Sequence, residues 1–118
     1  MRVRNTSNVL SQMFAKRYYM YKKIKEKDVI EKLKLVKDPE IGIDIWTLGL
    51  VYKITLEEDG AEVLMTLTTP FCPFADDLIA DVEKKVGELG YREGDVRVEL
   101  TFEPAWEPSE EVRMMLGV

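Results

Sequence analysis

The sequence VLMTLTTPFCPFADDLIADVEKKVGEL, residues 63–89, decides the fold because its hydrophobic period changes in the middle. Before Pro70, apolar residues at every second position predict a strand. After Pro73 the apolar positions recur every three to four residues, which predicts an amphipathic helix ending near Gly90. That helical stripe consists of Leu78, Ile79, Val82, Val86 and Leu89. A turn containing two prolines therefore joins a strand over 63–68 to a helix over 73–89.

Two other segments show the alternation of strands. The first covers 52–57 and is followed by Asp59-Gly60, a strong hairpin signal. The second covers 96–102 and ends before Pro104, which cannot donate to a strand ladder. A hairpin followed by a β-α-β crossover predicts a small three-stranded mixed sheet.

Two more helices complete the expected fold. A helix over 28–36 begins with Asp28 as N-cap and is closed by Pro39. A short last helix begins after Ser109 and ends at Gly117. We expect the helices over 28–36 and 73–89 to cover one face of the sheet. The order α-β-β-α-β-α predicts an α+β protein, built as a two-layer α/β sandwich.

Composition limits the chemistry that one chain can perform. The 118 residues are 46% hydrophobic and include one cysteine and no histidine. A single cysteine cannot form an internal disulfide, and no apolar run resembles a signal peptide or a membrane span, so we expect a cytoplasmic protein. Without histidine, Ser-His-Asp and Cys-His catalysis are excluded within one chain.

Charge divides the chain into two predicted parts. Residues 1–27 carry a net charge of +7 and form a predicted basic N-terminal extension, whereas the predicted domain over 28–118 carries −12. Tyrosines among the lysines of the extension are compatible with single-stranded nucleic acid. Because no nucleic-acid-binding motif accompanies them, we favour a mobile or loosely helical extension that lies against the acidic domain, and we expect neither nucleic acid nor membrane as a partner.

The lone cysteine, Cys72, is the main candidate for chemistry. Pro73 suits the first position of a helix, so Cys72 is expected at or next to the N-cap. Free backbone N–H groups and the helix dipole would favour its thiolate, which binds soft metals. The alternative is a buried cysteine that packs as a small hydrophobic residue.

Other polar and aromatic residues are expected near Cys72. The second and third strands are predicted to run parallel, so their carboxyl ends share one edge of the sheet, where ligand sites are common. The residues expected there, besides Cys72, are Asp38, Glu40, Thr68, Thr69 and Trp106. Each has an ordinary alternative role: the acids as turn residues, the threonines as backbone partners and the tryptophan as a half-buried or interface side chain.

The same segments carry a family resemblance. In order along the chain they are Asp38-Pro39-Glu40-Ile41-Gly42, Leu48-Gly49-Leu50-Val51-Tyr52, Thr68-Thr69-Pro70-Phe71-Cys72-Pro73 and Pro104-Ala105-Trp106. With these four motifs, residues 28–118 resemble the SufT/PaaD-like family of iron–sulfur cluster assembly factors. The resemblance implies that Asp38, Glu40, Thr68, Thr69 and Cys72 are cofactor-binding positions, with Cys72 as the metal ligand, and that Trp106 contacts a partner. It does not extend to residues 1–27.

Three functions follow from these residues. The first is a maturation factor that binds iron or an iron–sulfur cluster transiently through Cys72 and passes it to client apoproteins, with a homodimer left open. The second is a metal-free adaptor, including PaaD-like support of an oxygenase, that docks clients through the apolar loop 41–50 and Trp106. The third, a thiol oxidoreductase, is disfavoured because the chain has no histidine and no second cysteine. We therefore expect a protein that is not an enzyme.

Overall fold

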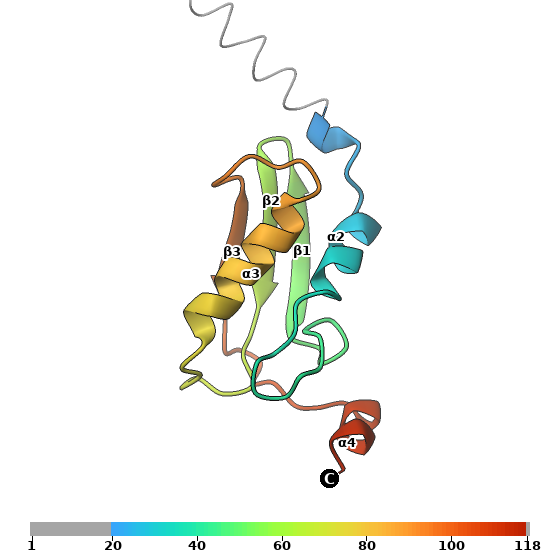
Figure 1. Ribbon diagram of the computed structural model, residues 1–118, viewed down its shortest axis with the longest axis vertical. Helices are drawn as coiled ribbons and strands as arrows, with labels where there is room; N and C mark the ends of the chain where they lie inside the picture. Colours follow the sequence, from blue (N-terminus) through green and yellow to red (C-terminus); the bar gives the residue numbers. More distant parts are fainter. Residues whose placement is uncertain (1–19, 118) are drawn as a thin grey trace, which may run out of the picture.

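The computed structural model describes residues 20–117 and confirms the predicted order of elements (Figure 1). The elements are α2 (Glu26–Leu33), β1 (Val51–Glu57), β2 (Gly60–Met65), α3 (Ala75–Gly87), β3 (Val96–Leu100) and α4 (Glu110–Leu116). The predicted α+β class, with helices packed on a three-stranded mixed sheet, is confirmed as well. No helix in the described range is long and apolar enough to cross a membrane.

The sheet has the order β1-β2-β3. β1 and β2 form the predicted antiparallel hairpin, and β2 and β3 are parallel. Met65, the last residue of β2, is paired with Val51 at the start of β1 and with Leu100 at the end of β3. α2 and α3 lie across the same face of this sheet, as predicted (Figure 1).

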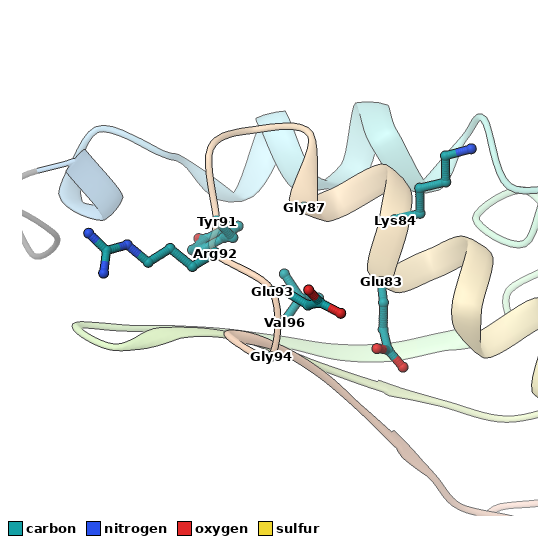
Figure 2. Close-up of a pocket in the computed structure, with 8 residues that line it drawn as sticks. All are labelled: Glu83, Lys84, Gly87, Tyr91, Arg92, Glu93, Gly94 and Val96. Carbon is teal, nitrogen blue, oxygen red and sulfur yellow. The ribbon is translucent and has the colours of Figure 1, made fainter.

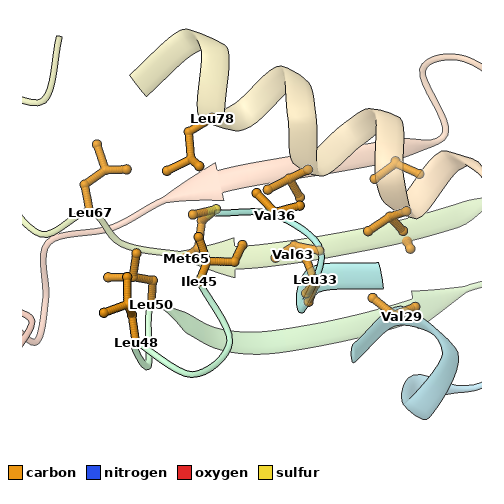
Figure 3. Packing of buried hydrophobic residues seen from close by; sticks show 14 of the residues in the cluster. Val29, Leu33, Val36, Ile45, Leu48, Leu50, Val63, Met65, Leu67 and Leu78 are labelled. Atoms are coloured by element: carbon orange, nitrogen blue, oxygen red, sulfur yellow. The ribbon is translucent and has the colours of Figure 1, made fainter. Parts of the chain in front are cut away.

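The hydrophobic core lies between these two helices and the sheet (Figure 3). Alternate residues of β2 point into it, as expected for a strand with one face covered. The fully buried side chains from the two layers include Val29 and Leu33 of α2, Val63 and Met65 of β2, and Val82 and Val86 of α3. The loop before β1 contributes Ile45, Leu48 and Leu50 to the same core.

Several predicted boundaries were wrong by a few residues. Asp28 is not the N-cap of the first helix. The N-cap is Lys25, and the Asp28 carboxylate accepts a hydrogen bond from the Lys25 backbone N–H at 2.9 Å. The carboxylate of Asp28, in the first turn of the helix, therefore accepts from the N-cap N–H, which has no partner within the helix backbone. The strands predicted over 63–68 and 96–102 also end earlier, at Met65 and Leu100.

The hairpin turn depends on Gly60. Its φ is +157°, and a Cβ atom built on it would lie 1.9 Å from the Asp95 carbonyl oxygen. The same oxygen accepts a hydrogen bond from the Ala61 N–H at 2.9 Å, so the backbone before β3 approaches β2 very closely here. Only glycine permits this approach, which explains why the Asp-Gly signal lies at this position.

Tyr21 packs in the folded domain, although the predicted boundary places it in the extension over 1–27. Its side chain is almost completely buried, and the centroid of its ring lies 4.6 Å from the centroid of the Tyr91 ring. Its hydroxyl donates to the Asp95 carboxylate at 2.6 Å and accepts from the Arg92 N–H at 3.0 Å. The packed part of the chain therefore reaches back at least to Tyr21. The rest of the predicted extension, including its other tyrosines and basic residues, lies outside the described residues.

Thr66 follows β2 and is fully buried. Its N–H donates to the Leu50 carbonyl at 2.8 Å, but its hydroxyl oxygen has no hydrogen-bond partner within residues 20–117. An unpaired buried hydroxyl costs about 1–3 kcal/mol.

We therefore predict that Thr66→Val raises the free energy of unfolding by about 1 kcal/mol, because it removes the unpaired hydroxyl at nearly constant volume. The control is Thr101→Val, since the Thr101 hydroxyl bonds the Glu103 backbone and its loss is expected to destabilise the protein. Urea unfolding followed by circular dichroism measures both. A clear loss of stability in Thr66→Val would show that the hydroxyl has a partner, such as a buried water.

Candidate functional site

The pairing of the strands brings three segments to one end of the sheet. Because β2 and β3 are parallel and in register, the segments after Met65 and after Leu100 leave at the same end. The loop before β1 enters there too, since Val51 also pairs with Met65. The Thr101 N–H donates to the Met65 carbonyl at 2.9 Å and extends the contact between the two departing segments. We call this region the carboxyl end of the sheet.

Cys72 lies in the loop that leaves β2, but it is not at the helix N-cap. α3 begins at Ala75 with Phe74 as its N-cap, so Cys72 and Pro73 precede the helix. The prediction that Pro73 is the first helical residue was wrong. A turn forms first, in which the Cys72 carbonyl accepts a hydrogen bond from the Ala75 N–H at 3.4 Å. The side chain of Cys72 is half-buried, is not in a disulfide and packs against the core.

The predicted threonines lie in the same loop. Thr68 and Thr69 are both half-buried. The Thr69 hydroxyl accepts a hydrogen bond from the Phe71 N–H at 3.3 Å, which shapes the turn next to Cys72. For Thr69, this contact is the backbone role that the sequence left open as an alternative.

Asp38 is a buried turn residue, with 2% of its surface exposed. One carboxylate oxygen accepts hydrogen bonds from the N–H groups of Glu40 at 2.9 Å and Ile41 at 3.0 Å. Its backbone closes the same turn with Gly42 and Ile43, at 2.7 and 3.0 Å. The Glu40 side chain is exposed. Asp38 therefore organises the loop before β1, whereas Glu40 faces solvent.

The predicted acids and Cys72 do not form a complete metal site. Within residues 20–117, no group of three or more histidine, cysteine, aspartate or glutamate side chains is placed to hold a metal ion. Four thiolates usually hold an iron–sulfur cluster. Any iron bound at Cys72 would need further ligands from a second molecule.

Trp106 connects the chain after β3 to the loop before β1. Its indole Nε1–H donates to the Leu48 carbonyl at 2.7 Å, and the side chain is half-buried against the core. Nearby, the Tyr52 hydroxyl donates to the Pro104 carbonyl at 2.9 Å. Sequence reasoning missed this role for Tyr52, because alternation on a strand does not tell where a hydroxyl finds its partner.

A separate pocket lies at the opposite end of the sheet, with a volume of about 400 Å³ (Figure 2). It is lined by Glu83, Lys84, Gly87, Tyr91, Arg92, Glu93, Gly94 and Val96. Burial, with a smaller contribution from Tyr21, raises the pKa of the Tyr91 phenol. Glu88, the C-cap of α3, does not line the pocket; the hydrogen bond from Lys32 lowers the pKa of its carboxyl group. None of the predicted site residues lines this pocket.

The chain belongs to the family described as "Iron-sulfur cluster assembly protein", which residues 26–100 match. It is 44% identical over 96 residues to an Fe-S protein maturation auxiliary factor of Porphyromonas gingivalis, covering 78% of this chain and 90% of that protein. It is 37% identical over 82 residues to the maturation auxiliary factor YitW of Bacillus subtilis, covering 69% of this chain and 79% of the relative. The expected family resemblance is thereby confirmed.

Solved structures agree with this assignment. A conserved hypothetical protein of Thermotoga maritima is 43% identical, with a TM-score of 0.68 and coverage of 81% of this chain and 97% of that one. A domain of unknown function from Bacillus anthracis is 32% identical, with a TM-score of 0.70 and coverage of 79% and 92%.

The geometry of Trp106 generates a stability prediction. Trp106→Phe keeps the aromatic ring but leaves the Leu48 carbonyl without its donor, so we expect a loss of about 1–2 kcal/mol in the free energy of unfolding. Trp46→Phe is the matched control, because the Trp46 indole makes no hydrogen bond within the described part of the chain. Urea unfolding of both variants measures the difference. Equal stability of the two would mean that the bond to Leu48 contributes nothing.

Asp38 gives a second prediction, which separates a structural role from iron binding. Asp38→Asn retains an oxygen that can accept both backbone bonds, whereas Asp38→Ala leaves two N–H groups without an acceptor. We expect Asp38→Ala to lose about 1–3 kcal/mol of stability and Asp38→Asn clearly less. Thermal and urea unfolding measure stability, and iron content after anaerobic reconstitution measures binding. A stable Asp38→Asn protein that no longer takes up iron would identify the carboxylate as a ligand.

Proposed function

We propose that this protein is a maturation factor for iron–sulfur proteins, which takes up iron or a cluster transiently at Cys72 and passes it to client apoproteins. The observation that carries the proposal is the position of the chain's one thiol. Cys72 is half-buried rather than sealed in the core, and it lies in a loop at the carboxyl end of the sheet. Membership of an iron–sulfur assembly family supports the same function.

The incomplete ligand set determines how such a site would work. One Cys72 supplies one thiolate, and a homodimer would supply two, so client cysteines, carboxylates or small thiols must complete the coordination. Iron held in this way exchanges readily. When a client thiolate replaces Cys72 on the iron, one iron–sulfur bond breaks as another forms, and the Cys72 thiolate takes up the proton that the client thiol releases.

The proposed role needs no catalytic residues. The chain contains no histidine and no second cysteine, so it has no resolving thiol and no imidazole base for a peroxidase or disulfide reductase mechanism. Its proposed partners are client apoproteins or other assembly proteins, and its proposed location is the cytoplasm. Three relatives, 37–44% identical, are named Fe-S protein maturation auxiliary factors, which supports this choice.

The metal-free adaptor finds less support in the positions of its contact residues. Ile45, Leu48 and Leu50 of the loop 41–50 are buried in the core, and Trp106 donates its N–H inside the molecule. These side chains are therefore occupied in holding the fold together.

Anaerobic reconstitution with iron and sulfide tests the proposal. We expect wild-type protein to bind iron and to gain visible absorbance, and Cys72→Ser to bind several-fold less, because serine replaces the only thiolate. Cys72→Ala should behave like Cys72→Ser, and near-wild-type unfolding curves of both would exclude a folding defect. Equal iron content in wild type and in the two folded variants would remove Cys72 from the proposed role.

A further inference from the structure

Large apolar side chains remain in solvent at the carboxyl end of the sheet, although Ile45, Leu48 and Leu50 of the loop 41–50 are buried. The most exposed is Phe71, beside Cys72, with 89% of its surface accessible. The others on the segments that leave β2 and β3, and on α4, are Phe74, Phe102, Met114 and Met115. An exposed phenylalanine in a short turn between two prolines contributes nothing to the core, so its surface is free for a partner.

The charges around these side chains have predominantly one sign. The exposed carboxylates on the same segments, in the first turn of α3 and on the loop before β1 are Glu40, Asp76, Asp77, Glu103, Glu107, Glu110 and Glu111. The exposed cations there, among the described residues, are Lys34, Lys37 and Arg113. We call these seven carboxylates and five apolar side chains together the acidic–apolar surface. Beside α4 the surface is hollowed, in a depression lined by Pro108, Glu110, Arg113 and Met114.

We infer that the acidic–apolar surface binds a segment of a partner protein that carries lysine or arginine together with large apolar side chains, with Phe71 as the main anchor. Exposed aromatic residues dominate the energy of many interfaces, and surrounding charges select the partner by complementarity. Seven carboxylates against three cations attract a cationic segment and repel nucleic acid and anionic lipid.

The charges also argue against a second copy as the occupant. A symmetric dimer buries the same patch of both protomers against itself, so its interface would bring two sets of seven carboxylates together. Like charges facing each other across an interface are costly. A partner of opposite charge satisfies the same apolar surface without this repulsion.

The inference deepens the proposed function, since it describes the partner to which iron would be passed. Only the biological purpose of the binding depends on the proposed function. Binding of a cationic segment requires no iron, so the two can fail independently.

The test uses a fluorescein-labelled peptide of 15 residues that combines lysine with leucine and tryptophan, and a matched peptide in which glutamate replaces lysine. Fluorescence anisotropy with the full-length, iron-free chain measures binding, and backbone amide shifts locate it. We expect the lysine peptide to bind at least tenfold more tightly than the glutamate peptide, with shifts concentrated at residues 70–77 and 101–117.

Substitutions then show which side chains of the acidic–apolar surface bind the peptide. Phe71→Ser should weaken binding about tenfold, and Glu110→Gln with Glu111→Gln should weaken it several-fold and reduce its salt dependence. The matched controls at the opposite end are Leu56→Ser, for the exposed apolar side chain, and Glu58→Gln with Asp59→Asn, for the charge. These should bind as wild type does.

Three outcomes would overturn the inference. The first is equal binding by Phe71→Ser and Leu56→Ser. The second is amide shifts confined to the end that contains Tyr91. The third is dimerisation of the free chain in sedimentation that Phe71→Ser abolishes, because the occupant would then be a second copy. If Cys72→Ser loses iron but binds the peptide normally, the surface stands; if iron uptake fails to depend on Cys72, the surface is unaffected.

Discussion

The parallel pairing of β2 and β3 is the constraint on which the rest of the structure depends. Because Met65 and Leu100 are register partners, the loop with Cys72 and the segment with Trp106 must leave the sheet side by side. The antiparallel pairing of Val51 with Met65 adds the loop of Asp38 to the same end. Residues more than sixty positions apart in the chain are thereby collected around the end of one strand. α3 supplies the crossover that parallel pairing requires, and its buried stripe covers the sheet.

The elements could be predicted where hydrophobic period decides the structure. The alternation in 63–68 buries its apolar side chains on one face only as a strand, and the stripe from Leu78 to Leu89 does so only as a helix. The types of the elements, their order and the two layers therefore followed from the sequence. Boundaries did not, because local hydrogen bonds decide them. Asp28 has the side chain of an N-cap residue, yet it serves from the third helical position. Pro73 fits a helix start, yet the turn after Cys72 is completed before the helix begins.

The position of the candidate site in the fold could be predicted, but the contacts of its side chains could not. Topology indicated that Asp38, Cys72 and Trp106 would gather at one end of the sheet. It gave no information on what each side chain would do there, since a carboxylate or an indole can bond the backbone as readily as a partner. Asp38 and Trp106 bond the backbone of the loop before β1. Phe71 shows the opposite case, because this large apolar residue remains in solvent.

Long-range side-chain bonds have a consequence for how the domain forms. Tyr52 and Pro104 are 52 positions apart, and Trp106 and Leu48 are 58 apart, so each bond closes a long loop of chain. Such non-local contacts slow folding, since the entropy of loop closure is lost before the contact is gained. Val112 of α4 is also part of the core. During synthesis, the native packing is therefore completed only after Val112 has left the ribosome, and shorter nascent chains expose part of the interior to chaperones.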